Sequence, residues 1–314
     1  MRVLFVSSGR QGKVNPIIQN QGDSLRRAGI EVDFYMVSGR GWKSYVKNIM
    51  PLRKQIKSGN YDVIHAHYAF CAYLVNIATL GFKKTLVVSL MGSDIWEHKW
   101  YPILVRTIAT IAHWKAVIVK SKEMRDRVGI SHASVVPNGV DMERFRELSK
   151  AECQNKLGWD MHKIHVLFPA DPSIARKNWP LAEGAVTKLN ARGKHIIELH
   201  AMVGVRNEDT PIHYNAADAV VLPSFYEGSA NAVKEAMACN VPIVTTDMGD
   251  CRERIEGVEG CYVANTYEVD EFSDLLTKAL RCDKTQGRER LLADGIADCQ
   301  VAERIIKIYE GIIE

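Results

Sequence analysis

Two glutamates flank the predicted start of a helix in the segment 218–249, which reads DAVVLPSFYEGSANAVKEAMACNVPIVTTDMG. The apolar run Ala219–Pro223 predicts a buried strand, and a helix is expected to begin near Asn231. Glu227 lies in the loop between them, and Glu235 lies about one turn into the helix. Backbone N–H groups at a helix start can bind phosphate, and a neighbouring carboxylate can hold the hydroxyls of a sugar or ribose. The alternative is an ordinary helix start with a capping loop.

Two histidines end another predicted strand, in the segment Tyr61–Tyr68, which reads YDVIHAHY. Side chains alternate along a strand, so His65 and His67 share one face. Zinc binding by this pair is the weaker interpretation, because no third ligand stands nearby in the sequence. His65 is interpreted as a packed structural residue, and for His67 both a binding role and a packed role stay open.

Short β-rich runs alternate with helical patterns in both halves, and this order is typical of parallel sheets built from βαβ units. The predicted strands are Val3–Ser7, Glu31–Val37, Val63–Ala66, Thr85–Ser89, Ala116–Lys120, His165–Phe168, Ala219–Pro223, Ile243–Thr245 and Gly260–Val263. Two such sheets, each in its own domain, fit the length. Ligands of these folds bind beyond the carboxyl ends of the strands, so functional residues should follow strands closely.

The polar, weakly periodic stretch Gly139–Lys163 predicts the domain boundary. We therefore expect an N-terminal domain at 1–160 and a C-terminal domain at 161–300. A terminal helix at 301–314, with apolar residues at helical spacing, is expected to pack back on the N-terminal domain.

Composition describes an ordinary globular chain of 314 residues, 46% hydrophobic and 25% charged, which excludes disordered and collagen-like classes. The net charge of +4 hides a split: residues 1–160 hold 24 basic and 13 acidic residues, whereas residues 161–314 hold 17 and 24. The seven cysteines include no C-x-x-C pair, which favours reduced thiols over a zinc or disulfide framework. With neither a signal-peptide pattern nor a long apolar span, a cytoplasmic protein is expected.

The segment PSFYEGSANAVKEAMACNVPIV resembles the E-x7-E signature of family-4 retaining glycosyltransferases, in a context that includes AADAVVLPS before it and TTDMG after it. Ala230 stands where proline is usual, and Asn240 stands where glycine is usual. The resemblance implies the GT-B fold, an α/β architecture. It consists of two facing Rossmann-like, doubly wound parallel-sheet domains with a cleft between them and a C-terminal helix that crosses back.

The resemblance also implies roles for the two glutamates. Glu227 would contact the transferred sugar, and Glu235 would bind the ribose hydroxyls of a nucleoside-diphosphate sugar. The backbone along the diphosphate would be that of Gly228, Ser229, Ala230, Asn231 and Ala232.

The segment His165–Trp179, HVLFPADPSIARKNW, corresponds to the family's strand, Gly-Arg pair and later lysine. Lys177 matches that lysine, whose charge would stabilise the departing nucleoside diphosphate. Asp171 stands where the family has its arginine, and we interpret Arg176 as the substitute. A solvated surface Arg-Lys pair is the alternative interpretation.

Three further positions follow from the resemblance. His67 would reach the donor sugar or the acceptor, and Gly12, in the loop after the first strand, would face both donor phosphate and acceptor. Asp94, in SLMGSDIW, would bind acceptor or order its loop, although Met91 replaces the family's histidine there. The segment Val135–Phe145, VVPNGVDMERF, is similar to a family segment and is interpreted as structural.

The stretch 40–57 is basic, and Trp42, Val46, Ile49 and Ile56 recur in it at helical spacing, with Pro51 expected to open a second segment. One interpretation is peripheral contact with an anionic membrane on the inner face of the plasma membrane. The other is a Rossmann helix with a solvated basic face. No nucleic-acid-binding motif accompanies the charge.

The resemblance therefore implies a metal-independent, retaining enzyme of the hexosyltransferase type, with no cofactor, because the nucleotide sugar is a co-substrate. It would transfer a sugar to a hydroxyl of a saccharide or lipid-linked acceptor. By family analogy, the reaction would belong to bacterial surface-polysaccharide biosynthesis. Two alternatives stay open: a nucleotide-sugar epimerase of the same architecture, and a non-catalytic subunit that binds sugar nucleotides.

Overall fold

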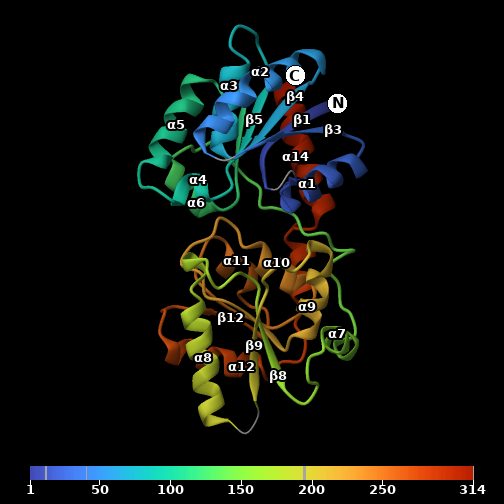
Figure 1. Ribbon diagram of the computed structural model, residues 1–314, viewed down its shortest axis with the longest axis vertical. Coiled ribbons are helices and arrows are strands. Elements are labelled where there is room, and N and C mark those ends of the chain that lie inside the picture. Colours follow the sequence, from blue (N-terminus) through green and yellow to red (C-terminus); the bar gives the residue numbers. More distant parts are fainter. Residues whose placement is uncertain (11–12, 40, 194–195, 314) are drawn as a thin grey trace. The chain divides into compact units, whose positions relative to one another are not determined.

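The computed structural model describes residues 1–10, 13–39, 41–193 and 196–313. It divides into two compact units, of which unit 1 comprises Met1–Gly139 with Asp298–Glu314 and unit 2 comprises Val140–Ala297. Each unit contains a mainly parallel sheet with apolar cores on both faces (Figure 1). The predicted class, two Rossmann-like doubly wound units, is confirmed.

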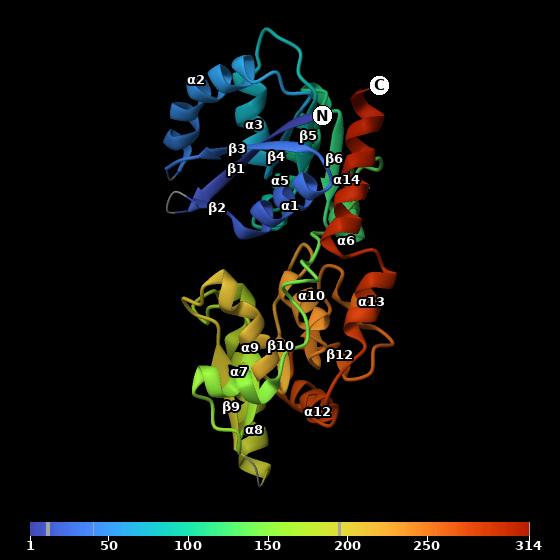
Figure 2. The same ribbon diagram turned by 90° about the vertical axis from the view of Figure 1, so that its right-hand side faces the viewer.

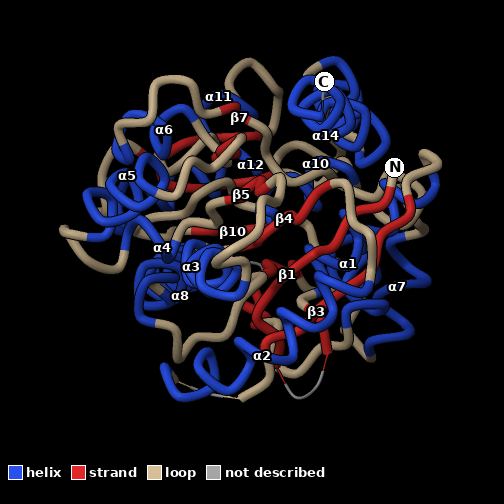
Figure 3. Tube along the Cα trace, turned by 90° about the horizontal axis from the view of Figure 1, so that it is seen from above, coloured by secondary structure: helices blue, strands red, loops and turns tan. Residues whose placement is uncertain are grey.

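In the sheet of unit 1 the parallel strands stand in the order β3-β1-β4-β5-β6-β7, and β2 pairs antiparallel with the end of β1. Figure 3 shows β3, β1 and β4 side by side. The strands are β1 (Arg2–Arg10), β2 (Lys13–Val14), β3 (Glu31–Val37), β4 (Val63–His67), β5 (Leu86–Ser89), β6 (Ala116–Val119) and β7 (Ser134–Val135). The two strands that sequence analysis missed, β2 and β7, have two residues each, which is too short to produce a pattern.

Helices cover both faces of this sheet. They are α1 (Pro16–Arg27), α2 (Trp42–Ser58), α3 (Ala69–Ala78), α4 (Ser93–Trp96), α5 (Tyr101–Ile111), α6 (Lys122–Val128) and α14 (Asp298–Ile313). Buried residues of α2, α3, α5 and α6 pack on one face, and those of α1 and α14 pack on the other. Figure 2 shows α2 and α3 together and α14 beside β6. The terminal helix buries Val301, Ile305 and Tyr309, which recur every four residues and thus form one stripe.

In unit 2 five parallel strands stand in the order β12-β11-β10-β8-β9 within the described residues. The strands are β8 (Ile164–Phe168), β9 (Ile197–Ala201), β10 (Ala219–Leu222), β11 (Ile243–Thr246) and β12 (Cys261–Ala264). The α-helices are α7 (Lys150–Leu157), α8 (Trp179–Arg192), α9 (Thr210–Ala216), α10 (Asn231–Ala238), α11 (Cys251–Ile255), α12 (Val269–Ala279) and α13 (Gly287–Ala293), and the short 3₁₀ helices are η1 (Ala175–Lys177) and η2 (Asn207–Asp209). Sequence analysis missed β9, because only Ile197 of this edge strand is fully buried and its apolar pattern is weak.

The boundary between the units lies at Gly139–Val140, well before the predicted position at 160. Val140, Met142 and Phe145 are buried in the core of unit 2, so the polar stretch behind them belongs to that unit. The chain returns to unit 1 beside this point, where a Cβ on Gly139 would lie 2.6 Å from the Cα of Asp298. The boundary therefore falls at the start of the predicted stretch Gly139–Lys163, and the rest of that stretch belongs to unit 2 because three spaced apolar residues anchor it there.

Candidate active site

The loop between β10 and α10 is held by two neighbouring segments at the carboxyl edge of the sheet in unit 2. The hydroxyl of Thr246 at the end of β11 donates to the carbonyl oxygen of Ser224 at 2.6 Å. On the other side, the backbone N–H of Phe225 donates to the carbonyl oxygen of Arg176 at 2.9 Å. The loop that carries Glu227 is therefore tied to the loop that follows β8, as expected for residues placed just after parallel strands.

Glu227 is the centre of this site. Its Oε1 accepts hydrogen bonds from Nη1 of Arg176 and from Nζ of Lys177, both at 2.5 Å. The side chains of Glu227 and Lys177 are only 14% and 13% exposed, whereas that of Arg176 is 36% exposed. Both cations keep further N–H groups that can reach phosphate oxygens. The structure thus brings Glu227 to two adjacent cations that lie 51 and 50 positions before it in the sequence.

Asp171, which stands where the family has arginine, turns its carboxylate to its own loop. Its Oδ1 accepts the backbone N–H of Ser173 at 2.9 Å, and this hydrogen bond lowers the pKa of the carboxyl group. Arg176 instead donates to Glu227, and its interpretation as the substitute cation stays a prediction.

Gly249, in the loop after β11, allows a second segment to approach Glu227. Its φ of +59° lies in the left-handed region, and a Cβ there would come within 2.9 Å of the carbonyl oxygens of Glu227 and Gly228. Only glycine fits this position without moving the loop. The motif TTDMG therefore has a steric role that the sequence analysis did not assign.

A buried polar network lies beneath the start of α10. Lys234 is fully buried, and its Nζ donates to the hydroxyl of Ser229 at 3.0 Å, which in turn donates to Oδ2 of Asp250 at 3.0 Å. Arg254 also donates to this carboxylate, at 3.2 Å. Burial lowers the pKa of Lys234 to about 8, against the attraction of Asp250. The network fixes the backbone of the loop that is predicted to bind diphosphate.

The N-cap residue of α10, Ala230, supplies no side-chain hydrogen bond to the first turn. Most helices use Ser, Thr, Asp or Asn at this position to satisfy the first N–H groups. The helix start therefore has no side-chain cap, and the diphosphate contacts of Gly228 to Ala232 stay a prediction.

Glu235 accepts a hydrogen bond from the hydroxyl of Tyr214 at 2.8 Å. Burial is the main reason why the pKa of this carboxyl group is raised, and the charges of Arg144 and Lys234 oppose the shift. The buried Nε of Arg144 has no hydrogen-bond partner among the described residues. Sequence analysis interpreted the segment with Arg144 as structural, and nothing in its spacing indicated this proximity to Glu235.

In unit 1, His67 ends β4 and is fully buried, and neither ring nitrogen has a hydrogen-bond partner among the described residues. Burial, followed by the neighbouring His65, holds its pKa well below the ordinary value, so the ring is neutral. Ser7, on the adjacent strand β1, also has a buried hydroxyl without a partner in the described parts of the chain. Such atoms are rare in folded proteins, and both side chains are buried.

His65 is a packing residue, as interpreted. Its Nδ1 lies 2.5 Å from the hydroxyl of Tyr309 on α14, and its Nε2 lies 2.8 Å from the hydroxyl of Ser89. These bonds attach the terminal helix to the sheet of unit 1.

Asp94 orders its own loop. Its carboxylate accepts backbone N–H groups from Gly92 at 2.8 Å and from Met91 and Ala69 at 3.0 Å. With only 2% of the residue exposed, these bonds leave it poorly placed to meet a ligand, so the loop-ordering interpretation replaces the acceptor-binding one. Gly12, the remaining predicted site residue, lies outside the described residues.

No group of three His, Cys, Asp or Glu side chains with metal-ligand spacing occurs around Glu227 in the described part of unit 2. One such group, His165, Glu198 and His200, lies elsewhere in the unit, on β8 and β9.

Two family models match the chain: "Glycosyltransferase Family 4" at residues 17–144 and "Glycosyl transferases group 1" at residues 178–282. Together they cover most of the chain, one in each unit. The chain belongs to the family-4 glycosyltransferases.

Three similar proteins illustrate this membership. TuaC of Bacillus subtilis, named for teichuronic acid biosynthesis, is 26% identical over 60% of this chain, which spans about half (54%) of that relative. The Escherichia coli UDP-Gal:alpha-D-GlcNAc-diphosphoundecaprenol alpha-1,3-galactosyltransferase is 23% identical, covering 74% of this chain and 70% of that protein. The structure of Anabaena Alr3699/HepE in complex with UDP-glucose has a TM-score of 0.75 at 15% identity, covering 99% of this chain and 100% of that one. The structural likeness shows the GT-B fold.

Proposed function

We propose that the protein is a retaining glycosyltransferase that moves a sugar from a nucleoside-diphosphate sugar to a hydroxyl of a saccharide or lipid-linked acceptor. The contact of Glu227 with Arg176 and Lys177, at the carboxyl edge of unit 2, carries this proposal. The carboxylate of Glu227 could bind sugar hydroxyls, and it is hydrogen-bonded to two cations that could bind a diphosphate. The names of the relatives point to bacterial surface-polysaccharide biosynthesis as the setting.

The proposed reaction is a front-face displacement. The bond between the anomeric carbon and the diphosphate oxygen breaks, and the acceptor oxygen bonds to the same face of that carbon. The acceptor's proton passes to the departing phosphate oxygen. Lys177, Arg176 and the start of α10 would stabilise the charge that develops on the diphosphate, and Glu227 would position the sugar.

The remaining roles stay as the resemblance assigns them. Glu235 would bind the ribose hydroxyls, and its hydrogen bond from Tyr214 would orient the carboxylate for that purpose. His67 would bind the sugar or acceptor through a ring nitrogen that no described residue occupies. No metal ion takes part in the proposed reaction.

The activity test uses UDP-, GDP- and ADP-sugars with saccharide acceptors, and the product's anomeric configuration is determined by NMR. The proposal expects transfer with the donor's configuration retained, and Lys177→Ala should reduce turnover about 100-fold or more. Lys188→Ala, on the same unit but paired with Asp270, is the matched control. Inversion at the anomeric carbon, or full activity in Lys177→Ala, contradicts the mechanism.

The two alternative functions give different outcomes in the same assay. An epimerase changes the donor sugar without any acceptor, and a non-catalytic subunit binds the donor without turnover. The proposal is preferred because the relatives reported above are named for glycosyl transfer or polysaccharide biosynthesis, and because Glu227, Lys177 and Glu235 are all present.

We further propose that α2 contacts an anionic membrane. None of the helices in the described ranges is both long and apolar enough to span a bilayer. The stretch 34–61 contains no Asp or Glu, whereas α2 exposes Lys43, Lys47, Lys54 and Lys57. Contrary to the sequence analysis, α2 is one continuous helix through Pro51.

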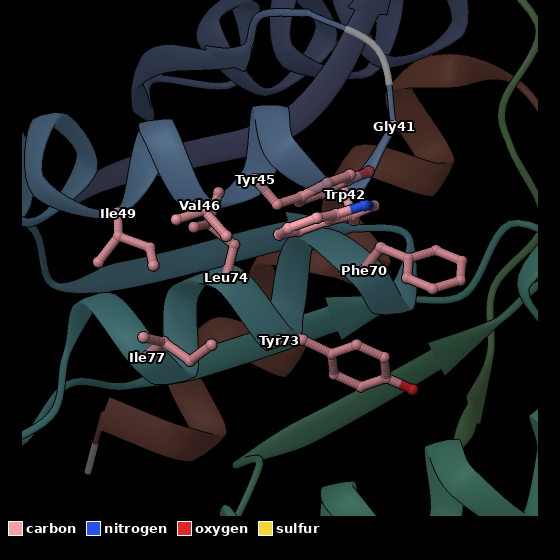
Figure 4. Close-up of a pocket in the computed structure, with 9 residues that line it drawn as sticks. All are labelled: Gly41, Trp42, Tyr45, Val46, Ile49, Phe70, Tyr73, Leu74 and Ile77. Carbon is pink, nitrogen blue, oxygen red and sulfur yellow. The ribbon is translucent and has the colours of Figure 1, made fainter.

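The same helix exposes apolar side chains beside these cations. Leu52 and Ile56 pack in the core, but Trp42, Val46 and Met50 are 73%, 55% and 69% exposed. Figure 4 shows Trp42 and Val46 with residues of α3 along an apolar pocket of about 390 Å³. One face of α2 packs on the sheet, as the second interpretation of the stretch 40–57 expects. The other face offers cations beside apolar groups, which supports the proposed membrane contact.

Sedimentation with vesicles of phosphatidylcholine, with and without phosphatidylglycerol, tests this contact. Binding is expected only with phosphatidylglycerol and should weaken as salt rises. Lys47→Gln should cost about 1 kcal/mol of binding free energy, and Trp42→Ala should also weaken binding. Trp100→Ala, an equally bulky exposed residue outside α2, should leave it unchanged. Equal binding to both kinds of vesicle contradicts the membrane contact.

A further inference from the structure

Two histidines and a glutamate share one face of the sheet in unit 2. In the register of β8 and β9, His165 lies opposite Glu198, and Leu167 lies opposite His200. Because side chains alternate along each strand, His165, Glu198 and His200 point to the same side. His165 is the second residue of β8, so the cluster lies toward the amino end of that strand, away from the loops that carry Glu227.

The donor atoms of these three side chains form a small triangle. Nδ1 of His165 lies 2.9 Å from Nε2 of His200, and each of these nitrogens lies 3.7 Å from Oε2 of Glu198. Ligand atoms about 2.0–2.2 Å from a tetrahedral zinc ion are separated by roughly 3.3–3.6 Å. The observed separations bracket this range, so an ion can bind with only small side-chain movements.

A contact on its other ring nitrogen orients the buried His165 toward the centre of this triangle. Nε2 of His165 lies 2.9 Å from the backbone carbonyl oxygen of Asp160, which can only accept a hydrogen bond. The proton of a neutral ring is therefore on Nε2, and the lone pair of Nδ1 faces His200 and Glu198. Metal-binding histidines are typically held in this way, by a carbonyl or carboxylate on the other ring nitrogen.

The surroundings hold the other two ligands and leave a path for an ion. Oε1 of Glu198 accepts a hydrogen bond from Lys163 at 2.5 Å, which leaves Oε2 directed at the histidines. Trp159 stacks on the ring of His200 with 3.7 Å between ring centroids. His165 is fully buried, whereas the side chains of His200 and Glu198 are 23% and 34% exposed, so the open side of the cluster faces solvent.

We propose that His165, Glu198 and His200 bind a divalent transition-metal ion, with Zn²⁺ as the best match to two imidazoles and one carboxylate. A water molecule would complete the tetrahedron. The ion replaces the hydrogen bond between the two rings, and His200 then carries its proton on Nδ1. Because all three ligands lie on β8 and the edge strand β9, the ion links these strands and stabilises unit 2. This site is separate from the proposed transfer reaction.

The test uses the full-length, untagged chain, stripped of metal with EDTA. Isothermal titration with ZnCl₂ should show one ion per chain, and CoCl₂ should give the visible absorption of a tetrahedral cobalt site. Zinc should raise the melting temperature, because an ion that binds the folded state stabilises it. None of these readouts depends on glycosyl transfer.

Variants at the partly exposed ligands identify the site without disturbing the buried His165. His200→Ala and Glu198→Gln should each weaken zinc binding by about 100-fold or more, because even outer-shell changes cost 10- to 100-fold. His213→Ala is the matched control, since this ring contacts Trp159 edge-on but is not one of the three ligands. Cobalt should quench part of the tryptophan fluorescence, and Trp159→Phe should remove that part.

Two results overturn the proposal. One is that the stripped chain takes up no zinc at a one-to-one ratio. The other is that His200→Ala and Glu198→Gln bind zinc as tightly as the parent chain, which would place the ion elsewhere.

Discussion

The two units use the same parallel-sheet plan but place different chemistry at the carboxyl edges of their sheets. In unit 2, Glu227 is paired with two cations, and a buried lysine supports the loop beneath it. In unit 1, the carboxylate of Asp94 is occupied by backbone N–H groups, and His67 is buried and neutral. One edge thus gathers partly exposed charges around a carboxylate, whereas the other holds a buried carboxylate and a buried neutral ring.

The net charges of the two units are opposite to what a diphosphate site in unit 2 would suggest. Unit 1 has 22 basic and 12 acidic residues, whereas unit 2 has 19 and 25. The unit with the negative balance is the one proposed to bind a diphosphate. Local placement of Lys177, Arg176 and the start of α10 therefore decides that site, and the basic excess of unit 1 is concentrated on surfaces such as α2.

The largest expected effect concerns the edge of unit 2. Glu227→Gln should reduce turnover about 100- to 1000-fold, because the neutral amide loses the charge that orders Arg176, Lys177 and the sugar. Thermal melting is measured alongside, because Glu227→Gln also leaves the mostly buried Lys177 without its carboxylate partner. The control is Glu259→Gln, at an exposed position of the same unit. Full activity in Glu227→Gln would contradict the proposed role of Glu227 in unit 2.

The matching change in unit 1 should act on stability. Asp94→Ala leaves three backbone N–H groups without their acceptor and should lower the free energy of unfolding by about 3 kcal/mol. Urea denaturation measures this change. Asp94→Asn, which keeps an acceptor oxygen, should recover part of the loss. A stable Asp94→Ala variant that no longer uses the acceptor would contradict the loop-ordering role and support acceptor binding by Asp94.

A smaller effect is expected at Gly249. Gly249→Ala should cost about 2 kcal/mol, shared between a positive φ and the displacement of the backbone at Glu227 and Gly228. Donor affinity should fall accordingly, as measured by calorimetry. Gly257→Ala separates the two causes, because Gly257 also has positive φ (+81°) but open space around it. Equal donor affinities in both variants would mean that the contact with the Glu227 loop is unimportant.

The smallest effect, taken per pH unit, is a pH dependence of stability from the buried Lys234. Its folded pKa, about 8, lies below the unfolded value near 10.5, so the unfolded chain binds more protons between these values. Stability should therefore rise with pH from about 8 to 10.5, relative to Lys234→Met, by about 1 kcal/mol per pH unit at most. Denaturation at several pH values measures the difference. Parallel pH profiles for the two proteins would show that Lys234 has an ordinary pKa.

Much of the fold follows from the sequence because buried parallel strands are continuous apolar runs. Val3–Ser7 and Ala219–Pro223 were readily predicted for that reason, and Glu227 was found because its motif is local. The edge strand β9 was missed because its apolar pattern is weak. The boundary falls at the first residue of the predicted stretch Gly139–Lys163, and only the domain limit expected at 160 lies too far along the chain.

The remainder of the site depends on contacts between distant residues. Asp250 lies 21 residues from Ser229, and Tyr214 lies 21 residues from Glu235, so no spacing rule connects them. The need for glycine at position 249 likewise appears only once the loop after β11 is packed against Glu227. The family resemblance assigned both Arg176 and Glu227 to the donor site, but the hydrogen bond between them was not predicted.

Donor binding tests the central claim most directly. Calorimetric titration with UDP-, GDP- and ADP-sugars should find at least one that binds the parent chain. Lys177→Ala should weaken that binding at least tenfold, and Lys188→Ala should leave it unchanged. If none of the nucleotide sugars binds, or if Lys177→Ala binds as tightly as the parent, unit 2 is not the donor site.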